Sequence, residues 1–342
     1  MVRTAPAPSD SEAYCAWYGD RANDVLYFGQ AAFWSGYRAR GGDPTADMET
    51  RGPLLIGRFD LRHERMLPPL DVRTEHNRTG VWDVLAHPNG RIYFTTFFSS
   101  AGFVDPESGR VRRFDNLGSG LNELAAGPGE SILVSRYAAD GRPGSILQID
   151  PEGRLLAEHP LGAPERYSAA PKTVAWDPAR RAIWVTNDLL PEGEGAIRHD
   201  AAVLAQDGRE LQRITQPELQ FVTFRSDGVG YAAEAEGATL SLHRVPPPGE
   251  TGAWHRIVLD EAFPAALDFV QDITRSEEGP IVVSRWSGSI HLVDDASGVV
   301  TSLKLPALAV DGLYYTATVR DDRLCATYCA GVTVVCRDLP ED

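Results

Sequence analysis

The chain of 342 residues lacks the features expected of a membrane protein. It contains no run of about 18 consecutive apolar residues, so no membrane-spanning helix is predicted. The opening segment, MVRTAPAPSDSEAY, has no apolar stretch of the kind that forms a signal peptide, which favours a cytoplasmic location. A sequence numbered from a mature terminus would look the same, and a secreted or periplasmic location is then expected.

Basic residues are scarce relative to acidic ones. There are 33 Lys and Arg against 48 Asp and Glu, for a formal net charge of −15. A nucleic-acid-binding face needs clustered Lys and Arg to neutralise phosphates, and only residues 110–113 and Arg180–Arg181 approach this. Both lie in or beside predicted turns and are interpreted as solvated surface. We expect no nucleic-acid partner, whereas neutral or cationic small ligands and divalent metal are compatible with the charge.

Several catalytic motifs are also absent. The sequence contains no G-x-S-x-G, H-E-x-x-H, G-x-x-x-x-G-K-[ST] or G-x-G-x-x-G pattern. Serine esterase, zinc protease and nucleotide-phosphate chemistry therefore have no support from the sequence.

Cysteine is rare and unevenly placed. The four residues are Cys15, Cys325, Cys329 and Cys336. If residues 12–18 pair with the last predicted strand (331–338), Cys15 lies near one of the other three, and a disulfide there would join the chain ends. Four buried, reduced thiols in a cytosolic protein are the alternative. Zinc is not expected, because Cys325-x3-Cys329 has no second pair of ligands at suitable spacing.

What the sequence does contain is a repeat. A unit of four short apolar strands joined by Gly- or Asp-bearing turns recurs about every 40 to 50 residues, which is typical of a β-propeller. We predict an all-β fold of four-stranded blades, seven in number with six as the alternative, closed by pairing of the N- and C-terminal strands. The predicted repeats of this single domain (1–342) are 14–72, 81–115, 121–161, 172–215, 219–259, 268–304 and 313–338.

The connections between the predicted strands differ on the two faces of the ring. Those leading into first strands, or joining second to third strands, are long at 33–52, 138–144 and 189–200. The opposite face has tight turns such as HPNG and SEEG. Long connections on one face indicate a binding site there, and drift in loop length is the alternative.

Polar residues on the predicted channel strands suggest two kinds of chemistry. Asp83, Glu123, Lys172 and Asp272 fall on first strands. Carboxylate and amide oxygens at or just before these strands suit a hard cation such as Ca²⁺ or Mg²⁺. A channel that simply holds polar residues and water is the alternative. The candidate metal ligands are Asn77, Glu123, Glu218, Asp268 and Asp311.

A second set of residues at the ends of second strands and on the rim would form an amphipathic small-molecule pocket. Its members are Trp34, Arg136, Tyr137, Asn187, Asp188, Arg285 and Trp286. The two Arg side chains would bind a carboxylate on the ligand, or alternatively pair with Asp or Glu between blades. Of the eight His, only His76 and His199 lie in long-loop connections and are candidate general bases. Lys172 would stabilise developing negative charge.

The unit in LAHPNGRIYFTT (85–96) and VAWDPARRAIWVTND (174–188) resembles the NHL-repeat and gluconolactonase/regucalcin-like propellers. It also resembles the seven-bladed streptogramin-lyase-like propellers. The resemblance covers residues 81–338 as a repeat pattern. It implies a channel metal bound at the starts of strands, where Asp311-Gly312-Leu313 matches the family pattern and Asn77 matches it more loosely.

We therefore expect a metal-dependent hydrolase of a small lactone or ester, with Ca²⁺ or Mg²⁺ in the channel activating water. One alternative is a non-catalytic propeller that binds a small ligand or a protein partner. A second is a streptogramin-lyase-like lyase, which needs a His–Glu acid/base pair with His76 or His199 as the His. The sequence does not indicate an oligomeric state.

Overall fold

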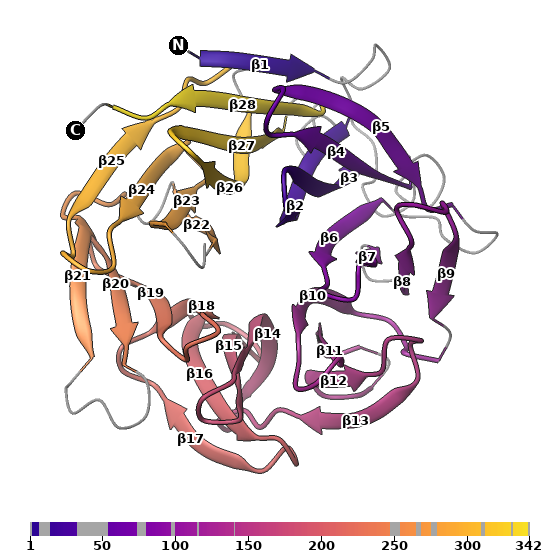
Figure 1. Cartoon of the computed structure of the whole chain (residues 1–342). Helices are drawn as coiled ribbons and strands as arrows, with labels where there is room; N and C mark the ends of the chain where they lie inside the picture. The colour runs from indigo at the N-terminus through magenta and orange to yellow at the C-terminus, as the bar shows by residue number, and fades with distance from the viewer. Residues whose placement is uncertain are drawn as a thin grey trace.

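The protein forms a ring of antiparallel sheets around a central channel, as a computed structural model shows (Figure 1). All regular elements in the described part of the chain are β-strands. The structure describes residues 2–6, 14–32, 54–73, 80–96, 100–114, 116–139, 141–246, 254–264, 268–274, 279–308, 312–329 and 331–340.

Five sheets contain four strands each, paired in sequence order. These blades are β6 (Val81–Ala86), β7 (Ile92–Thr96), β8 (Ser100–Val104), β9 (Val111–Phe114); β10 (Leu121–Ala126), β11 (Ile132–Arg136), β12 (Ser145–Ile149), β13 (Leu155–Pro160); β14 (Tyr167–Asp177), β15 (Ala182–Pro191), β16 (Arg198–Ala205), β17 (Glu210–Ile214); β18 (Leu219–Phe224), β19 (Gly230–Glu236), β20 (Thr239–Val245), β21 (His255–Asp260); and β22 (Val270–Thr274), β23 (Ile281–Arg285), β24 (Ser289–Val293), β25 (Val300–Lys304).

The remaining strands form one eight-stranded sheet in the order β1-β28-β27-β2-β3-β4-β5, with β26 also pairing with β27. Its strands are β1 (Val2–Pro6), β2 (Tyr14–Ala22), β3 (Val25–Ala32), β4 (Leu55–Asp60), β5 (Arg65–Asp71), β26 (Leu313–Arg320), β27 (Arg323–Cys329) and β28 (Thr333–Asp338).

The prediction of seven blades, with six as the alternative, is wrong, because the structure has five four-stranded blades. The strands assigned to the first and last repeats do not form two separate sheets. β2 pairs with β27 through Cys15 and Cys329, and this contact makes one continuous sheet from both ends of the chain. The repeat pattern could not show this contact, because it joins residues 314 positions apart.

The two ends of the chain close the ring. β1 pairs with β28 from Val2↔Arg337 to Pro6↔Thr333, so the predicted closure by the N- and C-terminal strands is confirmed. Among the described strands, Cys15 lies on β2, which pairs with β27 and not with the final strand. The Cys15–Cys329 disulfide joins β2 to β27 across the closure, and Cys325–Cys336 links the neighbouring strands β27 and β28. Cross-links of this kind limit the unfolded chain and thereby stabilise the fold.

Apolar side chains pack mainly between neighbouring sheets. The central strands β7, β11 and β23 are buried along their whole length, as expected of strands covered on both faces. In one typical cluster, Tyr93 and Phe103 of one blade pack against Leu121 and Ile132 of the next. This packing holds the first strands rigidly around the channel.

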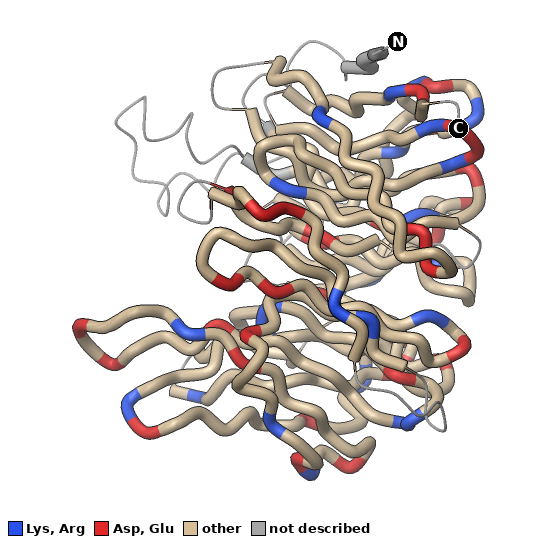
Figure 2. The backbone as a smooth tube through the Cα atoms, turned by 90° about the vertical axis from the view of Figure 1, so that its left-hand side faces the viewer, with Lys and Arg blue, Asp and Glu red and all other residues tan. Residues whose placement is uncertain are grey.

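The outer surface carries mixed charge. Figure 2 shows Lys and Arg positions interspersed with Asp and Glu positions along the described backbone on the side in view. The part of the chain that the structure describes contains no helix long and apolar enough to cross a membrane.

Candidate functional site

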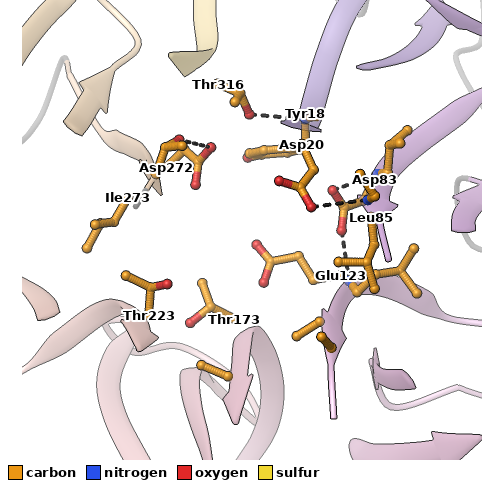
Figure 3. Close-up of a pocket in the computed structure, with 18 of the residues that line it drawn as sticks. Tyr18, Asp20, Asp83, Leu85, Glu123, Thr173, Thr223, Asp272, Ile273 and Thr316 are labelled. Carbon is orange, nitrogen blue, oxygen red and sulfur yellow. Dashed lines mark hydrogen bonds between the residues drawn. The ribbon is translucent and has the colours of Figure 1, made fainter. Parts of the chain in front are cut away.

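First strands from every sheet line a central cavity of about 500 Å³. Its walls come from β2, β6, β10, β14, β18, β22 and β26. Four carboxylates lie around it, those of Asp20, Asp83, Glu123 and Asp272 (Figure 3). Asn23 and Pro88, in the turns after β2 and β6, also line it, so the cavity extends to the tight-turn face.

A break in strand register explains why polar side chains occupy these positions. Each first strand contains a β-bulge or similar irregularity, which leaves a residue outside the normal ladder and re-aims its side chain. The shifts lie at Ala16/Gly19, Val81/Asp83, Leu121/Leu124, Pro171/Thr173, Leu219/Phe221, Val270/Asp272 and Tyr314/Ala317.

Carboxylates near two of these shifts connect β2 to β6 and β6 to β10. An Oδ atom of Asp20 accepts a hydrogen bond from the Ala86 N–H at 3.1 Å. Asp83 accepts one from the Leu124 N–H at 2.8 Å, and its other oxygen accepts the Val84 N–H at 2.8 Å. The carboxylates thus have a structural role in joining the sheets, whatever else they do.

Burial changes the ionisation of these carboxyl groups. It raises the pKa of Asp83 to about 8, with the nearby carboxylates of Asp272 and Asp20 adding to the shift and two backbone hydrogen bonds opposing it. Burial likewise raises the pKa of Asp272 to about 6. The pKa of Glu123 lies well above its usual value, owing to burial and then to Asp83 and Asp272.

An aromatic cluster lies toward the long-loop end of the channel. The Tyr18 hydroxyl donates to Gln271 Oε1 at 3.0 Å. The Tyr18 ring lies 5.5 Å from the Trp82 ring and 5.3 Å from the Tyr315 ring, and Trp17 packs on the same two residues at 4.6 Å. Since Tyr18 lines the cavity, the cluster forms its wall on this side.

A His–carboxylate pair occupies the end of β15 and β16. Asp188 and His199 are direct cross-strand neighbours, and His199 Nδ1 lies 2.9 Å from Asp188 Oδ1. The side chains are 30% and 22% exposed, so solvent reaches the pair. Burial raises the pKa of Asp188, but the His199 hydrogen bond and the Lys172 charge outweigh it, and the pKa is lowered overall. Asp188 therefore stays ionised at neutral pH.

Several predicted site residues lie close enough to interact electrostatically. The positive charge of Lys172 favours the ionised form of both Asp188 and Glu123 and so lowers the pKa of each. Its Nζ lies 4.8 Å from the Phe221 ring centroid. Burial raises the pKa of Tyr137, and the nearby carboxylates of Glu123 and Asp188 raise it further. The Tyr137 hydroxyl accepts a hydrogen bond from Asn122 Nδ2 at 3.1 Å. Part of the expected site is thus assembled around Lys172.

Other predicted residues are engaged between strands or sheets. Arg136 forms an ion pair with Glu158, and Asn187 Nδ2 donates to Asp200 Oδ1 at 2.8 Å. Trp286 packs edge-on against Phe269 with centroids 5.0 Å apart. Glu218 is half-buried just before β18.

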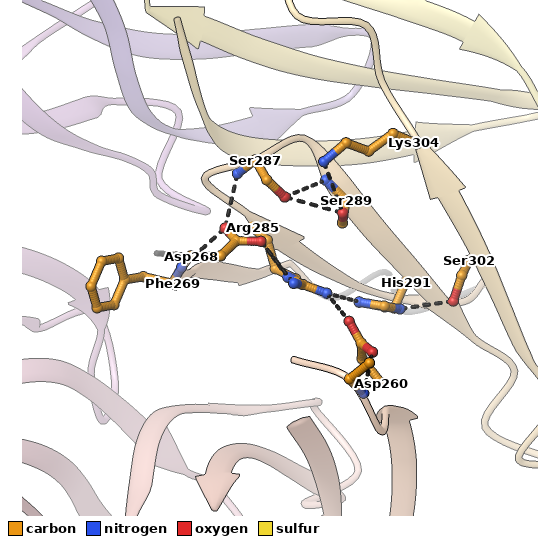
Figure 4. A network of polar contacts seen from close by, with 10 residues as sticks. Asp260, Asp268, Phe269, Arg285, Ser287, Ser289, His291, Ser302 and Lys304 are labelled. Atoms are coloured by element: carbon orange, nitrogen blue, oxygen red, sulfur yellow. Dashed lines mark hydrogen bonds and ion pairs between the residues drawn. The ribbon is translucent and has the colours of Figure 1, made fainter. Parts of the chain in front are cut away.

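Figure 4 shows the most connected of these arrangements. Arg285 contacts Asp268 Oδ2 at 2.7 Å and Asp260 Oδ2 at 2.6 Å, while its Nη1 lies 3.3 Å from His291 Nε2. Asp268 also accepts the N–H groups of Phe269 and Ser287. The network joins β21 to the following blade, and the side chains of both Arg285 and Asp268 are engaged in its hydrogen bonds and ion pairs.

The predicted metal site is not assembled by the residues that the structure covers. Among them, no group of three or more His, Cys, Asp or Glu side chains could hold a metal ion. Glu123 lies at the cavity, whereas Asp268 is bound to Arg285. Trp34, His76, Asn77 and Asp311 lie outside the described residues.

Sequence reasoning missed Tyr18 and Asp20 as channel residues, and read 189–200 as a loop. In fact β15 continues to Pro191 and β16 begins at Arg198. Asp20 could have been predicted as a channel residue from its position on a first strand. It was missed because β2 belongs to the sheet that both chain ends share, so its repeat is less regular than the others.

The chain folds as an all-β propeller, and comparison with solved structures identifies the same fold. Virginiamycin B lyase from Staphylococcus aureus aligns with a TM-score of 0.68 over 99% of each chain, at 12% identity. A catalytically inactive variant of that enzyme with quinupristin gives 0.65 over 98% of this chain and 99% of that one, at 11% identity. A streptogramin B lyase structure gives 0.67 over 98% of this chain and 97% of that chain, at 14% identity.

Similarity is not confined to lyases. The β-propeller domain of Cps50 (Swd1) from Myceliophteria thermophila gives a TM-score of 0.66 over 97% of this chain and 98% of that one, at 7% identity. No family model matches the chain, and no curated protein matches its sequence. At these identities the similarity establishes the fold alone, and activity has to be argued from the site.

Proposed function

We propose that this chain is a lyase of the streptogramin B lyase type, which opens a lactone by elimination with His199 as the general base. The Asp188–His199 pair carries the proposal, because it is half-buried but reached by solvent at the long-loop side and lies near the Lys172 charge. Among the similar structures described above are two of virginiamycin B lyase and one of a streptogramin B lyase. The comparisons thus favour this alternative over a metal-dependent hydrolase, for which they give no support.

The electrostatics of the pair suit proton abstraction. Ionised Asp188 accepts a hydrogen bond from Nδ1–H of His199, which fixes the tautomer and leaves the lone pair on Nε2. A His held in this way can accept a proton at Nε2 as a general base. Asp188 is the carboxylate partner here, in place of the Glu expected from the sequence.

The reaction needs no water. Nε2 of His199 takes the proton from the carbon adjacent to the one that bears the ester oxygen. The C–H electron pair forms a carbon–carbon double bond, and the C–O bond breaks with its electrons left on the departing carboxylate. The Lys172 ammonium stabilises the negative charge that develops during this step.

The mass of the product distinguishes the candidate reactions. We would incubate the protein with quinupristin and with a set of small lactones, and analyse the products by mass spectrometry. Elimination opens a lactone without changing its mass, whereas hydrolysis adds one water. A heavier product would support the hydrolase instead, and absence of any product with all compounds would support a binding propeller.

The disulfides bear on location. Disulfides persist mainly in oxidising compartments. Cys15–Cys329 and Cys325–Cys336 therefore support the secreted or periplasmic alternative over the cytoplasm.

A further inference from the structure

One blade extends further than its neighbours on the long-loop face. β14 and β15 contain 11 and 10 residues, whereas the first strands β6, β10 and β18 contain six each. The extra length comes from residues 167–171 of β14 and 187–191 of β15, which pair with each other. The start of β16 pairs with β15 on its other edge. We call residues 167–171, 187–191 and 197–200 the β14–β16 arm.

The face of the arm that turns toward the preceding blade is buried. Ala169 and Leu189 are 4% and 3% exposed, and both pack in one cluster with Leu133 and Ile146 of that blade. Gly144 lets the two blades approach closely, because a Cβ atom there would lie 2.2 Å from the backbone oxygen of Ala169. The arm is therefore fixed in place by its neighbour.

The opposite face of the arm carries the proposed catalytic pair and then two aliphatic side chains. Asp188 and Leu190 are two residues apart on β15, so the alternation of side chains along a strand puts both on this face. His199 lies on β16, and Ile197 comes two residues before it. The same face thus presents the polar pair and, about 7 Å further toward the tip of the arm, Leu190 and Ile197.

Other contacts agree with this alternation. Arg198 lies on the buried face, where its guanidinium carbon is 5.3 Å from the centroid of the Tyr167 ring, and Tyr167 packs on the buried cluster. Nearer the ring, Trp184 shares the face of Asp188 and packs on Phe224 of the next blade, with centroids 5.2 Å apart. The next blade therefore covers this face near the ring, and the face opens along the arm.

Leu190 and Ile197 are exposed at the open end of this face. Their exposed fractions are 40% and 54%, although aliphatic side chains of this size are usually buried. Single exposed apolar residues are common, but these two are neighbours. The register pairs Leu189 with Arg198, and Leu190 and Ile197 come next in the same order across β15 and β16. They form a small apolar surface that is continuous with the Asp188–His199 pair.

We propose that Leu190 and Ile197 bind an apolar side group of the substrate, so that the preferred lactones carry a butyl-sized or larger apolar substituent close to the carbon that loses its proton. This inference rests on the proposed function, because it takes His199 as the base beside which the lactone ring is held. Burial of each methylene group on such a surface favours binding by up to about fourfold. The two residues would therefore determine specificity, while the polar pair performs the chemistry.

The test compares two lactones that share one ring and differ only in a methyl or a butyl substituent. Each is titrated calorimetrically into the full chain carrying His199→Asn, so that turnover does not interfere. We expect the butyl lactone to bind about tenfold more tightly, because its three further methylene groups are covered on one side only. Equal affinities, or no binding of either lactone, would overturn the proposal.

Variants of the arm locate the surface. Leu190→Ser and Ile197→Ser, each added to His199→Asn, should reduce the preference for the butyl lactone to about threefold or less and leave the affinity for the methyl lactone unchanged. Leu190→Met keeps an apolar side chain and should keep the preference. Leu211→Ser is the matched control, since Leu211 is 49% exposed on the outer strand β17 of the same blade. An unchanged preference in both arm variants, or an equal loss in Leu211→Ser, would contradict the assignment.

The outcomes separate this inference from the proposed function. Tighter binding of the butyl lactone without an elimination product from wild type would support the apolar surface and remove the lyase. Elimination with equal kcat/KM for the two lactones would support the lyase and remove the apolar surface. Sedimentation tests the other occupant: a wild-type dimer that Leu190→Ser abolishes would show a second copy of the chain on this surface and would also overturn the proposal.

Discussion

Two neighbouring blades carry His–carboxylate pairs that are similar in bonding and different in surroundings. His199 Nδ1 lies 2.9 Å from Asp188 on β15/β16, and His243 Nε2 lies 2.8 Å from Glu234 on β19/β20. The side chains of the second pair are only 9% and 7% exposed. His243 packs against Trp254 with ring centroids 6.0 Å apart, and Arg256 lies 3.6 Å from Glu234.

The comparison shows that a His–carboxylate hydrogen bond does not by itself make the His a general base. In the Glu234 pair, Nε2 is the atom engaged by the carboxylate, and the pair is enclosed. In the Asp188 pair, Nδ1 is engaged and Nε2 remains for a substrate. We therefore assign chemistry to the first pair and stability to the second.

The largest expected effect is on turnover when the base is removed with its bond to Asp188 kept. His199→Asn places an amide nitrogen near the position of Nδ1 and deletes Nε2. Turnover should fall about 10²- to 10⁴-fold, the range typical of a lost general base. His243→Gln, which likewise keeps the bond to Glu234, is the matched control and should retain wild-type turnover in the same steady-state assay. Equal losses in both variants would break the comparison.

A second prediction concerns the carboxylates. Asp188→Asn removes the acceptor that fixes the His199 tautomer, and turnover should fall about tenfold or more, since such changes cost up to about 10⁴-fold elsewhere. Glu234→Gln should leave turnover within about twofold of wild type while changing stability. Initial rates at saturating substrate measure both, and a normal rate in Asp188→Asn would remove Asp188 from the mechanism.

For stability, we expect the buried His243–Glu234 pair to matter more than the His199–Asp188 pair. His243→Ala leaves the Glu234 carboxylate buried with one partner fewer, and should lower the free energy of unfolding by about 1–3 kcal/mol. His199→Ala breaks a partly exposed pair and should lower it by less than about 1 kcal/mol. Chemical denaturation compares the two variants, and a larger loss in His199→Ala would reverse our assignment.

The smallest effect is a pH dependence of stability. The pKa of Asp188 is lowered in the folded protein, so its contribution is present above the unfolded value of about 4 and is lost as pH falls below it. Asp188→Asn should therefore be less stable than wild type at pH 7, by under about 1 kcal/mol. The two proteins should converge as pH falls through the lowered pKa of folded Asp188, as denaturant midpoints over an acidic pH series would show. A constant difference would mean that the Asp188 charge is not involved.

The propeller class could be predicted because its signals are local. Strand alternation and turn residues recur within each repeat, as in 81–115, and need no knowledge of the rest of the chain. The number of blades could not be obtained in this way, because ring closure depends on β1 with β28 and on Cys15 with Cys329. Those contacts join residues more than 300 positions apart, and the sequence likewise left the partner of Cys15 open.

The candidate site was predictable only in part. His199 stands out by its place in a long connection, but its pairing with Asp188 depends on the register of a hairpin that the sequence presents as a loop. The repeat alignment placed Asp83, Glu123 and Asp272 on the channel strands, where they line the cavity, but it did not predict the register shifts beside them. Arg285 is an example of a residue that the sequence suggested for ligand binding but that has a structural partner instead. Its guanidinium forms ion pairs with Asp260 and Asp268.

The most direct measurement is the mass of the product that wild type and His199→Asn form from quinupristin or another lactone. The proposed mechanism predicts a ring-opened product of unchanged mass from wild type and His243→Gln, and almost none from His199→Asn. A product heavier by one water, or product formation by His199→Asn at the wild-type rate, would contradict it.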